Sequence, residues 1–270
     1  NDFSWRVSVN GAKVWNRYEK SYNNKDNSRG IIGKALNGIY GYRTEGYINS
    51  QDEVPIVYNN VGMSAPMGGI QYYKPGDLKF VDVNGDGSIG RGDQVYLGSA
   101  LPEISGGIVS ELKWKGFDLN VLFSYSLGRK MINVFRKGAL NFNPTSLNGV
   151  FEDYRNVSFW EKEGDQSDYP VMSSIYYYYE GQFDGMIDSN IETVNFLRLK
   201  QLTVGYNLPT DWAKKCYLQG VRVFFTGENL FLWSNYSGLD PENVDVMDGI
   251  DRMQYYPSSR KITLGLTVKF

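Results

Sequence analysis

Histidine is absent from the 270 residues, and Cys216 is the one cysteine. A Ser-His-Asp triad, a Cys-His pair and a zinc site that uses histidine are therefore excluded. A disulfide within the chain and a four-cysteine metal site are excluded as well. The net charge of −2 indicates no strongly basic surface, so we expect no nucleic-acid partner.

Long hydrophobic runs are also missing. The mean hydropathy is −0.41, and no run approaches the ~18 apolar residues that a membrane helix needs. A transmembrane β-barrel remains open, because its strands turn every second residue towards a polar lumen. The chain is 15% aromatic and contains 30 glycines, which favours strands joined by turns. Its first residues lack the basic and apolar regions of a signal peptide, so we expect a processed chain or an internal piece.

Strict two-residue alternation predicts strands in several segments. From Lys261 to Phe270 every even-numbered residue is apolar, and every odd-numbered residue is polar or glycine. The other clear segments are 3–10, 108–115 and 117–127, and weaker ones are 39–48 and 221–231. Lys115-Gly116 predicts a tight hairpin turn between two of them. Membrane barrels and soluble sandwiches both use such strands, so alternation alone leaves both architectures open.

The strand expected over 194–208 changes face near Lys200-Gln201. Its apolar residues are odd-numbered before this point and even-numbered after it. A β-bulge is the simplest cause, because one extra residue exchanges the two faces. After Pro209, Thr210 is expected to cap a short helix over 211–216, and Gly220 to stop it.

Two long stretches, 51–102 and 129–191, lack strand alternation, although residues 131–135 suggest a helical turn. Outer-membrane barrels carry long loops on the outer side and short turns on the inner side. If the C-terminal strand runs inward, every long connection falls outside except 11–37. That exception marks where the expected count of about seven strands is least secure.

A calcium-type loop occupies residues 82–93, inside the expected outer insertion 51–102. Oxygen donors stand at positions one, three, five and twelve, Gly87 permits the turn at position six, and position seven offers a carbonyl. The predicted ligands are Asp82, Asn84, Asp86, Ser88 and Asp93. A metal-free Asx/Gly turn is the alternative. No base or nucleophile accompanies the loop, so we expect a structural calcium ion and no catalysis.

Exposed rings and carboxylates are further candidates. The acidic residues that follow Trp160 predict a solvated loop rather than a glycosidase pair, whose spacing a sequence does not reveal. Aromatic rings stack on sugars and also form interface belts in barrels. The candidate substrate-binding rings are Trp160, Tyr176, Tyr178 and Trp233.

Several segments together resemble SusC/RagA-type TonB-dependent outer-membrane transporters. They are FLRLKQLTVGYNLP (196–209), VRVFFTGENLF (221–231), YSGLDPE (236–242), GDLKFVDVNGDG (76–87), KGFDL (115–119) and the terminal Phe270. They occur in the family's order, and the match spans residues 36–270.

The resemblance implies an all-β fold, with residues 1–270 as the C-terminal strands of a 22-stranded antiparallel transmembrane β-barrel that carries long extracellular loops. The plug domain is absent from this chain, and TonB contact would occur through the absent N-terminal part. Phe270 matches the family's barrel-assembly signal. The implied location is the bacterial outer membrane, in contact with its lipid.

The implied function is import of oligosaccharides or peptides together with a SusD-like surface lipoprotein, without enzymatic activity. The rest of the barrel and the plug would complete the channel. A secreted, calcium-stabilised β-sandwich that binds carbohydrate is the alternative. A barrel enzyme is third, because no carboxylate pair is located.

Overall fold

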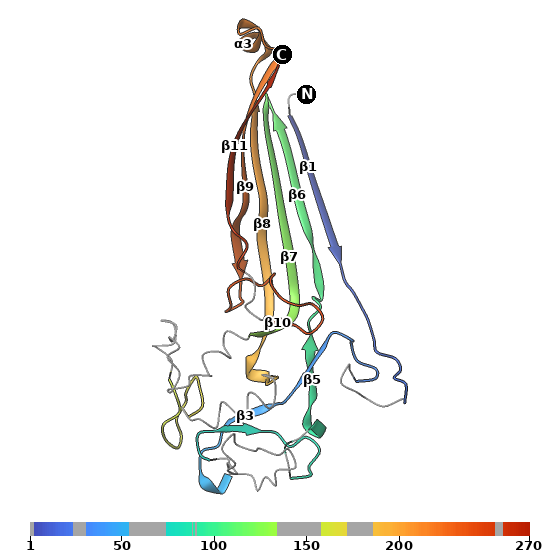
Figure 1. Ribbon diagram of the computed structural model, residues 1–270, viewed down its shortest axis with the longest axis vertical. Coiled ribbons are helices and arrows are strands. Elements are labelled where there is room, and N and C mark those ends of the chain that lie inside the picture. The colour runs from blue at the N-terminus through green and yellow to red at the C-terminus, as the bar shows by residue number, and fades with distance from the viewer. Residues whose placement is uncertain are drawn as a thin grey trace.

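The computed structural model describes residues 3–23, 31–53, 74–87, 89, 91–133, 158–171, 186–251 and 256–270. Its main body is one sheet of long strands that lie side by side (Figure 1). Across the sheet the strands are β1 (Phe3–Ala12), β6 (Ile104–Trp114), β7 (Phe117–Asn133), β8 (Ile191–Asn207), β9 (Gly220–Ser234) and β11 (Lys261–Lys269). The short β10 (Ile250–Asp251) adds to β7 in parallel.

Each long strand is antiparallel to its neighbours. β6 and β7 are joined by the predicted hairpin at Lys115-Gly116, where both residues have positive φ, 45° and 88°. Two positive φ angles define the tight turn whose twist matches that of the strands. The strands predicted over 3–10 and 261–270 are confirmed, and those over 108–115, 117–127 and 221–231 are longer than predicted.

The register places one kind of side chain on each face of the sheet. One row runs through paired residues of all six strands: Trp5, Leu112, Leu119, Val204, Phe225 and Leu264. The next row, on the opposite face, is Arg6, Glu111, Asn120, Thr203, Thr226 and Thr263. We call these the apolar face and the polar face. Trp5 is 64% exposed and Leu264 77% exposed, so no second layer covers these side chains among the described residues.

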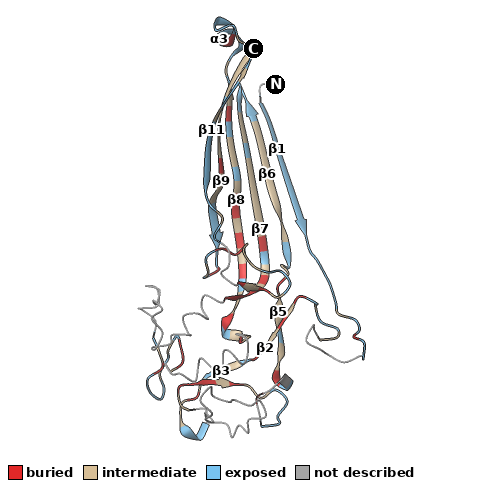
Figure 2. Cartoon of the chain, in the orientation of Figure 1, coloured by how far each residue is buried: buried red, intermediate tan, exposed pale blue. Residues whose placement is uncertain are grey.

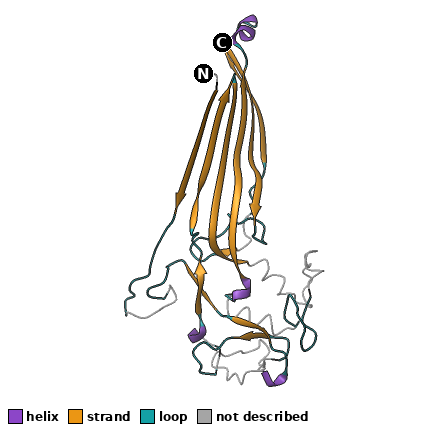
Figure 3. Ribbon diagram, turned by 180° about the vertical axis from the view of Figure 1, so that it is seen from behind, coloured by secondary structure: helices purple, strands orange, loops and turns teal. Residues whose placement is uncertain are grey.

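All the long connections lie at one end of the sheet. Figure 1 shows both chain ends and α3 (Thr210–Lys215) at the opposite end, which we call the α3 end, beside the short turns. Figure 3 shows the same division from behind, with the other short helical turns among the loops, at what we call the loop end. These turns are η1 (Gln51–Glu53), η2 (Arg91–Asp93) and η4 (Asp188–Asn190).

The strand predicted over 39–48 is wrong as part of this sheet. β1 pairs directly with β6, and the segment forms two short strands at the loop end. There β2 (Gly38–Gly41) pairs with β5 (Val95–Ser99), and β3 (Thr44–Tyr47) pairs with β4 (Leu78–Phe80). The main sheet therefore has six long strands where about seven were expected. The connection from β1 to β6 starts and ends at the loop end, so the inner connection 11–37 that broke the orientation pattern does not exist.

Two local predictions also need correction. Residues 131–133 continue β7 and form no helical turn, because Met131 and Ile132 pair with β8 and Asn133 pairs with Asp251 of β10. Residues 134–135 lie outside the described residues. Helix α3 begins at Thr210, with Pro209 in the capping position and no side-chain cap, and it ends at Lys215 with Cys216 as its C-cap, before Gly220 is reached. Cys216 is free and exposed.

Buried side chains concentrate at the loop end (Figure 2). Met131, Ile132 and Val194 lie where β7 and β8 meet the loops, and Ile39 and Ile48 lie within the loops. No helix in the described ranges is long and apolar enough to cross a membrane. The structure therefore combines a single-layer sheet with a compact loop region that has a small core of its own.

Candidate functional site

The polar face carries hydrogen-bonding side chains along its length. In mid-sheet the Thr203 and Thr226 hydroxyl groups lie 3.1 Å apart and share a hydrogen bond. Near the α3 end Arg222 forms a two-point pair with Asp118, Nη2 to Oδ2 at 2.6 Å and Nε to Oδ1 at 3.2 Å. Such a face attracts water and polar solutes, whereas the exposed apolar face does not.

The predicted bulge is confirmed, and it decides where Arg198 points. Leu199 pairs with Phe123 of β7 and Gln201 with its neighbour Leu122, so Lys200 is the extra residue of β8 against β7. Before the bulge the even-numbered residues of β8 are on the polar face, and after it the odd-numbered residues are. Without the extra residue, Arg198 would lie on the apolar face.

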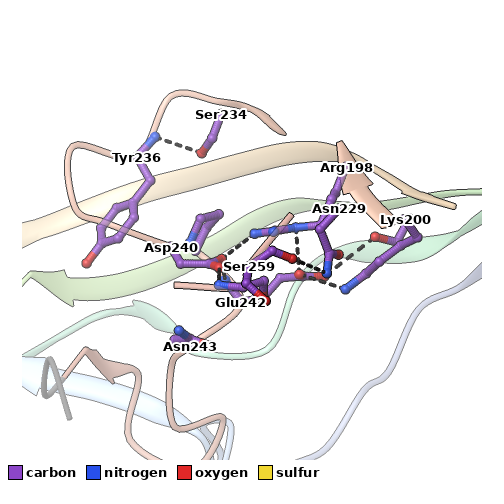
Figure 4. Close-up of polar contacts among 12 residues, drawn as sticks. Arg198, Lys200, Asn229, Ser234, Tyr236, Asp240, Glu242, Asn243 and Ser259 are labelled. Carbon is purple, nitrogen blue, oxygen red and sulfur yellow. Dashed lines mark hydrogen bonds and ion pairs between the residues drawn. The ribbon is translucent and has the colours of Figure 1, made fainter. Parts of the chain in front are cut away.

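Arg198 belongs to a buried ion cluster with Asp240, Glu242 and Lys200 (Figure 4). Its Nη2 pairs with Asp240 Oδ1, and these two side chains are only 4% and 2% exposed. Its Nε lies 2.7 Å from Glu242 Oε2 without the alignment of a hydrogen bond, and Lys200 Nζ lies 2.8 Å from the same oxygen. Two cations and two carboxylates balance, which is the condition for burying charge.

The cluster fastens residues 235–251, which we call the β9–β11 loop, onto the polar face of β7 and β8. Two backbone groups also donate to Asp240, Glu242 N at 3.0 Å and Ser258 N at 3.0 Å. Ser124 Oγ on β7 donates to Glu242 at 3.5 Å, and Arg129 Nη1 donates to the Pro241 carbonyl at 3.4 Å. The loop is therefore held by charge-assisted bonds to two strands.

A small apolar core completes this attachment. Tyr236 of the loop packs with Met131 and Val194, and Val244 joins them. The Tyr236 hydroxyl donates to Asp251 at 2.7 Å. Burial, together with this hydrogen bond, raises the pKa of Tyr236, so the hydroxyl remains a donor. The sequence motif YSGLDPE contains several of these residues, but their role becomes visible only when Arg198 is placed opposite them.

The predicted calcium loop lies at the loop end and is closed by its own hydrogen bonds. Asp82 accepts from Gly85 N and Gly87 N, both at 2.7 Å. Asp93 is 1% exposed, and its Oδ1 accepts from Val83 N at 2.9 Å. Position twelve therefore returns to the start of the loop, as a calcium loop requires.

The donors present are hard oxygens that suit calcium in kind. Asn84 Oδ1 accepts from Asp86 N at 2.9 Å, and Asn84 Nδ2 donates to Asp86 Oδ2 at 3.0 Å. Within the described residues, no three or more His, Cys, Asp or Glu side chains are gathered closely enough to hold a metal ion. That search does not count the Asn84 amide, and Ser88 lies outside the described residues. Calcium binding stays a prediction.

The candidate rings have different surroundings. Trp160 is 7% exposed. Its ring packs so closely on Gly76 that a Cβ added to this glycine would lie 2.5 Å from Trp160 Cε3. Trp160 therefore packs within the loops rather than offering a stacking face. Trp233 lies in β9, not in a loop, on the apolar face beside Phe231, with ring centroids 5.8 Å apart. Tyr176 and Tyr178 lie outside the described residues.

The acidic residues after Trp160 shape their own turn. Asp165 Oδ2 accepts from Glu161 N at 3.0 Å and from Lys162 N at 2.9 Å. Asp168 Oδ2 accepts from Ser158 N at 2.9 Å. Phe270 is 85% exposed and continues the alternation of the apolar face; its role in assembly stays a prediction.

Comparison with known proteins gives consistent relatives. No family model matches the chain. It is 30% identical over 283 residues to the TonB-dependent receptor SusC of Bacteroides thetaiotaomicron, covering 100% of this chain and 25% of the relative. TonB-dependent receptors P26 and P3 of Formosa agariphila are 30% identical over 256 residues and 27% over 301, covering 90% and 100% of this chain and 24% and 27% of the relatives. The chain thus spans about a quarter of the curated relatives it matches.

Solved structures give the same fold. The structure of the RagAB peptide transporter matches with a TM-score of 0.64 and 22% identity, over 100% of this chain and 27% of that chain. The RagAB peptide importer in its "closed-closed" state matches with a TM-score of 0.59 and 22% identity, over 100% of this chain and 28% of that one.

The fold and these relatives define the class: the sheet is a fragment of the β-barrel of TonB-dependent receptors, located in the outer membrane. Within that class the chain aligns over its full length with part of receptors of the SusC/RagA type, as its motifs indicated. The apolar face is the lipid-facing side, and the polar face lines the lumen. The alternative of a soluble β-sandwich is wrong, because six strands form one sheet whose apolar face is exposed.

Proposed function

We propose that this chain forms part of the wall of a transporter that imports oligosaccharides or peptides through the outer membrane. The polar row opposite an exposed apolar row, with a loop attached to the polar side, supports this most directly. Polar hydroxyl and amide groups suit the passage of hydrogen-bonding oligomers, and the remainder of the barrel and the plug would complete the channel. SusC and RagAB, a peptide transporter, are the relatives that support import.

The proposal includes two protein partners. A SusD-like surface lipoprotein would cover the loop end, which carries all the long connections. TonB would supply energy through the part of the receptor that precedes this chain. SusC and the RagAB peptide transporter are the relatives that support the first partner.

The test is uptake by cells that lack the receptor and by cells that carry it again. We expect loss and recovery of uptake for one class of labelled oligomer, glycan or peptide, and the same loss when TonB is deleted. Affinity purification of the full receptor should bring down a surface lipoprotein. Unchanged uptake of both classes in the deletion strain would contradict the proposal.

We also propose that loop 82–93 binds one structural calcium ion, with Asp82, Asn84, Asp86, Asp93 and the carbonyl of Ser88 as ligands. The spacing of these donors, and the return of Asp93 to the start of the loop, support it. The ion would neutralise acidic groups that otherwise repel one another.

The test compares the full receptor with a variant that carries Asp82→Ala and Asp86→Ala. Bound calcium, measured by equilibrium dialysis, should fall by one ion per chain. The matched control carries Asp52→Ala and Glu163→Ala, two exposed acidic residues outside the loop, and should keep the ion. Equal calcium content in parent and loop variant contradicts the proposal.

A further inference from the structure

The α3 end of the sheet carries exposed aromatic and basic side chains on two elements, helix α3 and the β6–β7 hairpin. Trp212 of α3 is 67% exposed, and Trp114 and Phe117 beside the hairpin are 51% and 48% exposed. Lys214 and Lys215 close the last turn of α3 and are exposed, as is Lys115 in the hairpin. We call this group the rim patch: Trp114, Lys115, Phe117, Trp212, Lys214 and Lys215.

The lysines of the rim patch are exposed and take part in no ion pair among the described residues, although Asp211 stands in the first turn of α3. No carboxylate among the described residues forms an ion pair with Lys115, Lys214 or Lys215. The nearby Asp118 is already paired with Arg222 on the polar face. Lys115 Nζ instead lies 5.7 Å from the centre of the Trp114 ring, over the apolar side. The patch therefore presents positive charge next to a hydrophobic surface.

The hairpin residues Trp114 and Phe117 continue the lipid-facing surface of the sheet. Phe117 and Tyr206 are paired on the apolar face, with ring centroids 4.3 Å apart, in the last row before the turns. Helix α3 stands just beyond the strand ends at this position (Figure 1). Beyond the end of an apolar band lies the headgroup layer, where tryptophan rings and lysine side chains are favoured.

We propose that the rim patch binds the headgroups of anionic phospholipids in the inner leaflet of the outer membrane. The lysines would pair with headgroup phosphates, and Trp212 would lie among the glycerol groups. An anionic lipid such as phosphatidylglycerol is favoured over the zwitterionic phosphatidylethanolamine, because its net charge is not cancelled within its own headgroup. The inference rests on the outer-membrane location and does not depend on the cargo.

The first experiment uses the full receptor in nanodiscs of phosphatidylethanolamine and phosphatidylglycerol. Native mass spectrometry then measures the enrichment of phosphatidylglycerol among retained lipids. Lys214→Gln with Lys215→Gln should reduce this enrichment roughly twenty-five-fold, because each of the two lysines near an anionic surface contributes about fivefold. The matched control, Lys20→Gln with Lys162→Gln at the loop end, should leave it unchanged. Equal enrichment in the parent and the Lys214/Lys215 variant overturns the proposal.

The second experiment locates residue 212 relative to the bilayer. A nitroxide is attached to Trp212→Cys in a receptor whose Cys216 is replaced by serine. We expect the nitroxide at residue 212 to collide more often with oxygen than with a water-soluble nickel complex. The ratio of the two collision rates should approach that of a label at Leu264→Cys on the apolar face. A label at Lys20→Cys gives the aqueous reference. Aqueous behaviour at residue 212 overturns the proposal, and transport that persists in these variants leaves the proposed import function standing.

Discussion

Removing Arg198 from the ion cluster should release the β9–β11 loop from the barrel wall. The informative substitution is Arg198→Met, which keeps most of the side-chain length and removes the charge. Asp240 would then remain in its 2% exposed position without a cation on its Oδ1 oxygen. Its bonds from Glu242 N and Ser258 N, both at 3.0 Å, would remain but cannot neutralise it.

The magnitude follows from the burial of the pair. Removing one partner of a buried ion pair costs about 3–5 kcal/mol, because the remaining charge is left uncompensated in a region of low polarity. Here the cost applies to the attached state of the loop, since Asp240 regains water when the loop opens. Each 1.4 kcal/mol is tenfold in an equilibrium constant, so the open population should rise by roughly a hundredfold or more.

Hydrogen exchange of the full receptor measures this opening directly. The amide of Ile132 on β7 bonds to Gly249 O of the loop at 2.8 Å, so it reports on an attached loop. Its exchange should accelerate roughly a hundredfold or more in Arg198→Met. Peptides from β11 at the edge of the sheet should not change.

The matched control is Lys200→Gln. Lys200 shares Glu242 with Arg198, but its side chain is 34% exposed, so solvent screens the loss and we expect less than about 1 kcal/mol. If Arg198→Met changes exchange by no more than this control, the buried pair does not hold the loop and the reasoning is wrong. Faster exchange throughout β11 would instead indicate a failure of the whole sheet.

Three further predictions concern single positions. Burial raises the pKa of Asp77 from 3.8 to about 6, so the folded state binds the proton of this carboxyl more tightly than the unfolded state does. The local free energy of unfolding should therefore fall as the pH rises from 3.8 to about 6. The loss is at most about 3 kcal/mol, and hydrogen exchange measured against pH should lose this dependence in Asp77→Asn. Gly76→Ala should destabilise the packing of Trp160 by roughly 2 kcal/mol or more, because φ is +92° and the new Cβ would lie 2.5 Å from the ring; unchanged proteolysis of residues 158–171 would refute this. Gly116→Ala places a Cβ at φ +88° and should cost about 1–2 kcal/mol, seen as a lower yield of folded receptor, whereas Gly116→Asn should lose less.

The strands and their faces could be predicted because the signal is local. Alternation places Leu264 and Thr263 on opposite faces whatever the rest of the chain does. The bulge at Lys200 was equally visible, since a change in the parity of apolar residues has few causes. Lys115-Gly116 marked its hairpin for the same reason, as two residues determine the turn.

The loop end could not be predicted in the same way, because its order comes from contacts between distant segments. Gly38–Gly41 looks like part of a barrel strand, yet it pairs with Val95–Ser99 in a separate small sheet. Asn37 donates to the Val246 carbonyl, 209 residues away, at 2.9 Å. Trp160 is buried against Gly76 by the same kind of long-range packing, and nothing next to it in the sequence indicates this.

The bulge, the ion cluster and the loop explain one another. A barrel wall must keep charge off its lipid-facing side, so an arginine in a membrane-spanning strand needs both a lumen-facing position and a partner. The extra residue at Lys200 provides the first, and the loop that carries Asp240 and Glu242 provides the second. Arg198 and the loop depend on each other. Without the loop, Arg198 would be an isolated cation on the wall. Without Arg198, the loop would bury two carboxylates with only Lys200 to balance their charge. The charge pairing thus makes the change in strand alternation at Lys200 the attachment point of the β9–β11 loop on the polar face.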